Sequence, residues 1–332
     1  MANEKIKISV AVVAYNEEKN IRECLDSLAH LDYPLEDIEV IVVDNNSTDR
    51  TREIVREFPR FRLIVNPVRG IAASRNLALR QGRYDFLAFT DADCTVPTDW
   101  LLKLSLALLQ AKRDDPSIAA VGGGNSAPES MNLFRQAIDI AVKTFWGNHG
   151  SVQGRIIKDR TYVDHLPTLN VLYDRKLILT EGSFDEEMGS MGEDVELSYR
   201  LKWRGYKLLY VPDALVQHKW RTDLRSWILN MVAYGRGRIW LMKKDKRFFS
   251  IMNLVPLALL LCTIMAPFVT IIPLYVIPLV YVILTALVSL FACARAKRLD
   301  LVLLVFAIYI ITHYSYAIGE LEGVIRTRGK GH

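Results

Sequence analysis

The stretch DFLAFTDADCTVP, residues 85–97, decides the fold class and the position of the site. Its apolar run from Phe86 to Phe89 is typical of a buried strand, and it ends in two acids, Asp91 and Asp93. Residues two apart in an extended segment point the same way, so the two carboxylates resist ionising unless they share a cation. Hard divalent cations such as Mg²⁺ and Mn²⁺ take oxygen ligands and keep positions open for phosphate oxygens. The pattern favours a site for a metal-bound diphosphate; the alternative is a loop in which one acid caps the next helix.

Strand and helix signals alternate on both sides of this stretch. Three β-rich runs precede it and one follows it, and helical patterns separate them: IKISVAVVAY, DIEVIVVD, FRLIVN and IAAVGG. Such a series predicts an α/β fold with a mostly parallel sheet covered by helices on both faces. Ligands of these sheets bind beyond the carboxyl ends of the strands. Because Tyr15, Asp44 and Asp91 each stand at such an end, we expect them to converge on one sheet edge.

Several familiar sites are missing from the sequence. No GxGxxG follows the first expected strand and no GxxxxGK[ST] occurs anywhere, which argues against a dinucleotide or P-loop enzyme. The triple glycine 122–124 follows a later strand and predicts a turn. The four cysteines form no CxxC or other ligand spacing and are expected to be reduced, structural thiols.

The last third of the chain has the composition of membrane helices. No Asp, Glu, Lys or Arg occurs between Ser250 and Ala294, and a membrane helix needs about 20 apolar residues. We expect two spans, roughly 253–272 and 274–294, and a third candidate at 299–319. The topology of the last helix is open.

Positive charge flanks the expected spans. The formal net charge is +5, and basic residues lie just before the first span and just after the second: Lys243, Lys244, Lys246, Arg247, Arg295, Lys297 and Arg298. The positive-inside rule then places the soluble part in the cytosol, with the chain in the cell membrane as a multi-pass protein; the N-terminus shows no signal sequence. Membrane lipids are the expected partners of these charges, and nucleic acid is not, because the soluble part lacks a basic stripe with aromatics.

The sequence resembles the family 2 glycosyltransferases with the GT-A fold. Five motifs carry the resemblance, in this order: VVAYNEEKNIRECLDSL, VIVVDNNSTDRT, RGIAASRNLALRQG, FTDADC and GEDVELSYRLKWRGYKLLYVPDALVQH. They cover about residues 6–220. The resemblance implies a GT-A catalytic domain over 1–220, and composition divides the rest into an amphipathic segment 221–250, about three transmembrane helices over 251–322 and a basic tail 323–332.

The resemblance assigns roles in binding a nucleotide-sugar donor. Asp44 accepts from the base, Tyr15 and Glu17 line the nucleotide pocket, Arg75 lies near the base or phosphates, and Asp91 sits at the ribose.

The resemblance also implies a metal site. Asp93 binds Mg²⁺ or Mn²⁺, which bridges the diphosphate, and His218 stands where relatives supply a third metal contact. Many relatives carry a second acid after the one that matches Asp44; here it is Asn45, which leaves the base preference open.

The acceptor side follows from the same comparison. Glu193 and Asp194 match the ED motif, in which Asp194 takes the proton of an acceptor hydroxyl as it attacks the anomeric carbon, and such help contributes about 10²- to 10⁴-fold. The competing interpretation is plain helix capping, because a helix N-terminus favours carboxylates. Asn170 matches a position near the acceptor or sugar.

The segment 223–249 mixes aromatic and basic residues, which suits the membrane interface. Its Arg236 and Arg238 can meet a lipid diphosphate or ordinary headgroups, and the sequence does not separate these.

The leading hypothesis is a membrane-anchored, metal-dependent, inverting glycosyltransferase that moves one sugar to a lipid-linked glycan. One alternative is a polyprenyl-phosphate glycosyl synthase, whose acceptor phosphate needs no base. Another is a non-catalytic membrane protein that keeps the fold to bind a partner.

Overall fold

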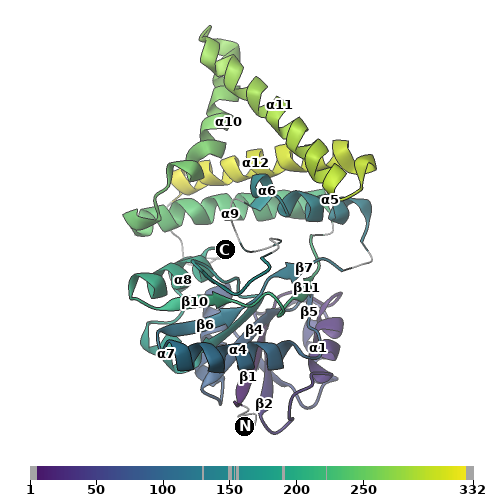
Figure 1. Ribbon diagram of the computed structural model, residues 1–332, viewed down its shortest axis with the longest axis vertical. Coiled ribbons are helices and arrows are strands. Elements are labelled where there is room, and N and C mark those ends of the chain that lie inside the picture. Colours follow the sequence, from purple (N-terminus) through teal and green to yellow (C-terminus); the bar gives the residue numbers. More distant parts are fainter. Residues whose placement is uncertain are drawn as a thin grey trace. The chain divides into compact units, whose positions relative to one another are not determined.

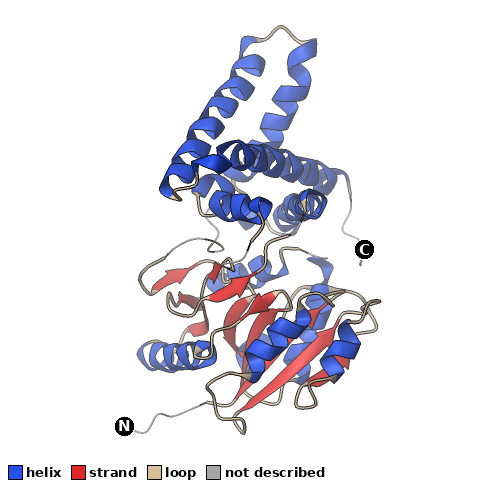
Figure 2. Cartoon of the chain, turned by 90° about the vertical axis from the view of Figure 1, so that its right-hand side faces the viewer, coloured by secondary structure: helices blue, strands red, loops and turns tan. Residues whose placement is uncertain are grey.

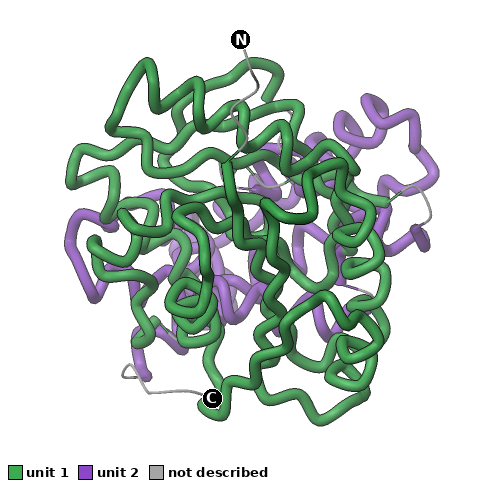
Figure 3. Tube along the Cα trace, turned by 90° about the horizontal axis from the view of Figure 1, so that it is seen from below, with its two compact units in different colours: residues 1–128, 152–219, 330–332 green, residues 129–151, 220–329 purple. Residues whose placement is uncertain are grey.

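The structure is a computed structural model that describes residues 6–128, 131–148, 152, 154, 157–188, 191–221 and 223–326. It divides into two compact units (Figure 3). Unit 1 comprises Met1–Pro128, Val152–Lys219 and Lys330–His332, and unit 2 comprises Glu129–Ser151 and Trp220–Gly329. By its contacts the chain passes from unit 1 to unit 2 between Lys219 and Trp220, and residues 129–151 also group with unit 2.

Unit 1 is built around an eight-stranded, mostly parallel sheet (Figure 1). Its strand order is β3-β2-β1-β4-β9-β6-β10-β8, and the strands β1–β4 and the pair β6–β10 run parallel. The strands are β1 Ile8–Ala14, β2 Ile38–Asp44, β3 Arg62–Val65, β4 Phe86–Asp91, β6 Ile118–Gly122, β8 Thr161–Val163, β9 Asn170–Asp174 and β10 Lys207–Tyr210. The predicted α/β class with a mostly parallel sheet is confirmed. Strand β9 lies antiparallel between β4 and β6, a position that the sequence pattern does not predict.

Helices cover both faces of this sheet (Figure 2). Alternate side chains of β1 show how: Val10 and Val12 pack into a core with α1 and α4, whereas Ala11 between them packs into a second core with α3, α7 and α8. This alternation follows from the two-residue period of a strand. The helices are α1 Ile21–Ala29, α2 Thr51–Arg56, α3 Ile71–Gln81, α4 Trp100–Asp114, α7 Arg175–Thr180 and α8 Glu193–Trp203.

A second, three-stranded sheet lies in unit 1, in the order β5-β11-β7. Its strands are β5 Cys94–Thr95, β7 Asn125–Ser126 and β11 Val216–His218. β5 follows the two acids of the opening stretch, and α4 begins only at Trp100, so neither acid caps the next helix. Gly123, in the triple glycine before β7, has no room for a side chain, because a Cβ there would lie 1.7 Å from Ala214 O. Gly122 is the last residue of β6, and the glycine run serves a close backbone approach rather than the expected turn.

Unit 2 is helical. It contains α5 Leu133–Val142, α6 Phe145–Asn148, α9 Leu224–Lys244, α10 Val255–Met265, α11 Ile272–Arg295 and α12 Val302–Ile325. The early segment 131–148 belongs here by its contacts: Thr144 Oγ1 lies 2.7 Å from Tyr309 OH, and Trp146 O lies 2.8 Å from a ring nitrogen of His313. Its mixed composition resembles that of the soluble part, which explains why the sequence did not assign it to this unit.

The amphipathic segment expected at 221–250 forms α9, and one face of α9 packs on α12. Trp227 and Met231 are buried, and the backbones touch at glycines: a Cβ on Gly235 would lie 2.0 Å from Tyr316 O, and one on Gly319 would lie 2.0 Å from Val232 O. Small residues permit such close helix pairs in membrane proteins.

Three segments are long and apolar enough to cross a membrane, namely Ile251–Phe268, Ile272–Arg295 and Leu299–Ile325. They match the three expected spans closely. The chain turns between Phe268 and Ile272, and Pro273 lies in the first turn of α11, where its missing N–H is harmless.

Candidate active site

The sheet register of unit 1 brings distant acids to one edge. In the parallel pairings, Ala14 lies opposite Asp44 and Val13 lies opposite Asp91. Tyr15, Asp44 and Asp91 therefore end neighbouring strands at the same level, which confirms the predicted convergence. This carboxyl edge is where ligands of parallel sheets bind.

Asp44 is completely buried, and only one of its two carboxylate oxygens accepts hydrogen bonds from described residues. Its Oδ2 accepts from Ser47 N at 3.1 Å and from Arg52 Nε at 2.5 Å. Its Oδ1 is buried without a hydrogen-bond partner among the described residues. Because an unmade buried hydrogen bond is costly, Oδ1 is suited to accept an N–H from a ligand. The following Asn45 accepts from Gly70 N at 2.8 Å and so fixes the loop before α3.

Tyr15 and Glu17 line the same edge differently. The Arg69 guanidinium lies 4.1 Å from the Tyr15 ring centroid, a cation–π contact. Glu17 accepts from Asn20 Nδ2 at 2.8 Å, so its carboxylate supports the start of α1.

Asp93 and His218 form a candidate metal centre. Asp93 Oδ2 lies 3.5 Å from His218 Nε2, because β5 pairs Cys94 with His218 and Lys219 N donates to Asp93 O at 3.1 Å. Asp93 and His218 are 125 positions apart in the sequence (218 − 93), and the fold brings them together. The Cys94 thiol lies within the same cluster.

The donor set of this cluster fits a divalent cation of the Mg²⁺ or Mn²⁺ type. Its carboxylate oxygen is a ligand typical of Mg²⁺ and Mn²⁺, and its imidazole nitrogen is a ligand of transition-metal ions, which favours Mn²⁺ of the two. Burial, and next the charge of Asp93, raise the pKa of the Cys94 thiol well above its ordinary value. Without a bound ion the thiol is protonated, and Asp93 and His218 are the residues of the cluster that could hold an ion.

Arg75 joins the donor edge to the ED motif. Its side chain is only 4% exposed; it pairs with the Glu193 carboxylate and lies 3.5 Å from Asp91 Oδ1. Arg75 is therefore a buried, paired cation and not a solvated charge on its helix. Through it, β4, α3 and α8 meet at one cation.

Glu193 and Asp194 open α8, after Gly192 in the left-handed conformation at φ 95°. Their electrostatics differ. Burial raises the pKa of Glu193 to about 7, against the opposing charge of Arg75. Burial also acts to raise the pKa of Asp194, but His165 and then Arg75 outweigh it and lower this pKa to about 2. Asp194 is therefore ionised at neutral pH, as a proton acceptor must be.

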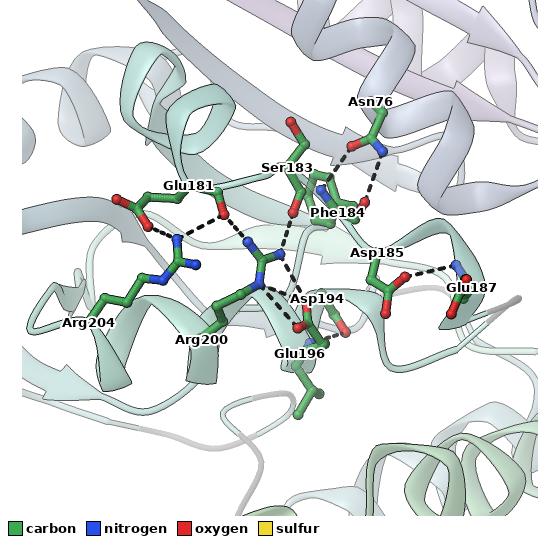
Figure 4. Close-up of polar contacts among 11 residues, drawn as sticks. Asn76, Glu181, Ser183, Phe184, Asp185, Glu187, Asp194, Glu196, Arg200 and Arg204 are labelled. Carbon is green, nitrogen blue, oxygen red and sulfur yellow. Dashed lines mark hydrogen bonds and ion pairs between the residues drawn. The ribbon is translucent and has the colours of Figure 1, made fainter. Parts of the chain in front are cut away.

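A second arginine, Arg200, connects α8 to the turn at residues 181–184 (Figure 4). Arg200 pairs with Glu196 and donates to the carbonyl oxygens of Glu181 and Ser183. Asn76 of α3 donates to Phe184 O at 2.9 Å and accepts from Phe184 N at the same distance. These contacts join α8 and α3 to the turn at residues 181–184.

Asn170, expected near the acceptor or sugar, begins β9 opposite Thr90 and so lies at this sheet edge, but it is buried. Asn170 has no exposed surface, and its amide accepts from Trp100 Nε1 at 2.8 Å and donates to Gly124 O and Ala214 O. Arg236 and Arg238 are in unit 2, where Arg236 pairs with Glu322 at 3.2 Å and Arg238 donates to Tyr316 OH at 3.4 Å.

Three site residues escaped the sequence analysis: Arg52, Arg69 and His165. His165 Nε2 lies 3.2 Å from Asp194 Oδ2. No local pattern marks them, because each meets its partner through the fold; a basic residue near an expected strand end was the only signal available.

Comparisons with known proteins agree with the fold. The family model "Glycosyl transferase family 2" matches residues 9–177. A Methanococcus voltae protein is 24% identical over 76% of this chain and 78% of its own length; its name is dolichyl N-acetyl-alpha-D-glucosaminyl phosphate 3-beta-D-2,3-diacetamido-2,3-dideoxy-beta-D-glucuronosyltransferase. A pre-mycofactocin glycosyltransferase from Mycobacterium tuberculosis is 32% identical over 69% of this chain, which spans 46% of that relative.

Among solved structures, a mannosyltransferase from Pyrobaculum calidifontis in complex with GDP-Man and Mn²⁺ superposes with a TM-score of 0.62 at 19% identity. The match covers 97% of this chain and 88% of that one. At this identity the likeness supports the fold, a GT-A-like α/β domain followed by C-terminal helices.

Proposed function

The chain belongs to glycosyl transferase family 2, and from this premise we propose that it moves a single sugar from a nucleotide-diphosphate sugar to a lipid-linked glycan or similar membrane acceptor. One observation carries the proposal: the buried cation Arg75 pairs with Asp91 at the strand edge and with Glu193, the residue before the ionised Asp194. A fold kept only to bind a partner has no need for an ionised, partly exposed carboxylate beside such a cation.

The donor binds at the carboxyl edge of the sheet in this proposal. The base donates an N–H to Asp44 Oδ1, which is buried and lacks a described partner. Tyr15, under Arg69, offers a ring face for the base, Glu17 supports the adjoining loop, and Asp91 accepts from the ribose. The side-chain oxygen of Asn45 already accepts from Gly70 N. Asn45 therefore offers the base fewer free acceptor atoms than an acid at this position would offer.

Asp93 and His218 would hold Mg²⁺ or Mn²⁺ at the diphosphate. When bound, such an ion neutralises the negative charge that develops on the leaving diphosphate. Arg75 pairs with the Asp91 carboxylate and so holds it in place.

Asp194 acts on the acceptor. Its ionised carboxylate takes the proton from an acceptor hydroxyl while that oxygen attacks the anomeric carbon, and this single displacement inverts the configuration. Glu193 does not need to titrate in this step; it pairs with Arg75 and so aligns the two halves of the site. Asn170 supports the sheet from inside, and Arg236 and Arg238 remain proposed contacts of the lipid acceptor's phosphates or of headgroups.

The membrane acceptor is supported by three candidate spans and by the relative whose name specifies a dolichyl-linked substrate. We propose that the spans lie in the cell membrane with unit 1 on the cytoplasmic side, since basic residues flank the first two spans.

A donor screen tests the proposal. Nucleotide sugars are added to the purified full chain with Mg²⁺ or Mn²⁺, and thermal unfolding is recorded. A true donor at about 100 times its Kd stabilises the folded state by about 2.7 kcal/mol. If no nucleotide sugar raises the Tm with either ion, the proposal is wrong.

The variant Asp194→Asn then tests the chemistry. We expect kcat to fall by about 10²- to 10⁴-fold while donor affinity stays unchanged, because the carboxylate acts on the acceptor. Steady-state turnover of the donor found in the screen measures this. Full turnover by the variant would instead favour a polyprenyl-phosphate synthase, whose phosphate acceptor needs no base.

A further inference from the structure

A histidine that no sequence motif marks lies against the proposed base. His165 Nε2 is 3.2 Å from Asp194 Oδ2, and the two side chains are 18% and 21% exposed. The same nitrogen is buried and makes no hydrogen bond of good geometry with any described residue, so its approach to Asp194 is a close polar contact. The carboxylate is therefore the group that this nitrogen faces.

The loop that carries His165 is anchored on both sides. It connects β8 to β9. Asp164 pairs with Lys202 of α8 at 2.5 Å, and Leu166 is completely buried in the core that α8 shares. The buried Leu166 anchors the loop, and the exposed Asp164–Lys202 pair adds a contact to α8, so the imidazole lies beside the first turn of α8.

The Asp194 carboxylate is held at both oxygens. Oδ1 accepts from Val195 N at 2.8 Å, and Oδ2 faces the imidazole. We propose that His165 is a positioning residue whose Nε2–H donates to Oδ2 and holds the carboxylate toward the acceptor hydroxyl. This inference deepens the proposed function and rests on it.

The other charges around Asp194 do not replace this contact. Arg75 comes from α3, Glu193 from α8 and Asp91 from β4, while the Tyr173 hydroxyl comes from β9. Of these, only Arg75 favours the ionised form, and it is already paired with Glu193. Loss of His165 therefore raises the pKa of Asp194 and frees the carboxylate to rotate.

The first test needs no donor. His165→Phe, Asp194→Asn and the double variant of the full chain are compared with wild type by thermal unfolding in detergent. We expect the two single effects on Tm to be non-additive, because the residues share one contact. Additive effects would overturn the proposed contact, whatever the enzyme does.

The second test measures turnover with Mn²⁺ and two donors, GDP-mannose and UDP-GlcNAc. His165→Phe should lower kcat by about 10- to 100-fold, as misplaced catalytic groups do, with donor KM unchanged. His165→Gln should recover part of the rate, because its Nε2–H can reach the place of the imidazole Nε2–H. The acidic limb of the rate should move to higher pH in His165→Phe. The matched control is His30→Gln, at the exposed end of α1.

The results of these tests distinguish the positioning role of His165 from the proposed function. An active His165→Phe with wild-type kcat and pH profile would overturn the positioning role and leave the proposed function standing. A wild-type protein inactive with every nucleotide sugar of the donor screen would overturn the proposed function, and the positioning role would fall with it even if the thermal coupling were found.

Discussion

Arg75 is the residue on which the site depends most. A buried guanidinium is tolerated only when it is paired, and Arg75 meets this condition with two acids from different elements, Asp91 and Glu193. The sequence placed Arg75 in a motif but gave no means of finding its partners, because Glu193 lies 118 positions further along the chain. Asp44 and Asp91 were predictable since each ends a strand; Arg69 and His165 were not, since neither does.

Replacement of Arg75 should lower the free energy of unfolding of unit 1. Arg75→Met leaves Glu193 buried without its cation, and breaking a buried pair in this way costs about 3–5 kcal/mol. For a unit of this size we expect the Tm to fall by about 10 °C, measured by thermal unfolding. Arg80→Met on the exposed side of the same helix is the control. Equal Tm values for the two variants would contradict the structural role of Arg75.

Glu193 should make stability fall as pH rises. Burial raises its pKa from 4.5 to about 7 in the folded state, so between these values the folded protein binds a proton that the unfolded chain has lost. The free energy of unfolding then decreases with rising pH across this window, by up to about 3 kcal/mol. Tm measured from pH 5 to pH 8 should fall more steeply for wild type than for Glu193→Gln. Parallel curves would show that Glu193 does not titrate there.

At the scale of elements, the order of strands and helices was predictable and the pairing of the later strands was not. Alternating β and α signals require a parallel sheet for the first strands, because each crossover is covered by a helix. β9 enters antiparallel between β4 and β6, a choice made by packing. The short strands β5 and β11 bring His218 to Asp93, and two- or three-residue strands leave no periodicity in a sequence.

The helix pair α9–α12 depends on glycine. A Cβ on Gly319 would lie 2.0 Å from Val232 O, and backbone cannot yield as a flexible side chain does. Gly319→Ala should therefore separate the helices and destabilise unit 2 by about 1–3 kcal/mol. Thermal unfolding of the full chain in detergent measures this, with Ile318→Val at the neighbouring exposed position as control. A Gly319→Ala protein as stable as the control would show that the two helices do not need this approach.

At the scale of the whole molecule, composition predicted most of the organisation. A charge-free stretch of this length has few solutions other than membrane helices, and the three candidate spans fall where expected. The assignment of 131–148 to unit 2 could not be predicted, because it depends on contacts such as that of Thr144 with Tyr309. One chain therefore combines a GT-A-like α/β unit with a helical unit of membrane-type composition.

The central proposal is that Asp93 holds the cation through which the diphosphate of the donor binds. Calorimetric titration of UDP and of GDP into the full chain, with Mn²⁺ or with EDTA, tests this for wild type and Asp93→Asn. We predict that one of the two nucleotides binds wild type with Mn²⁺ and that its binding is lost both in EDTA and in the variant. Equal affinity of that nucleotide for wild type in Mn²⁺ and for Asp93→Asn in EDTA would contradict the account.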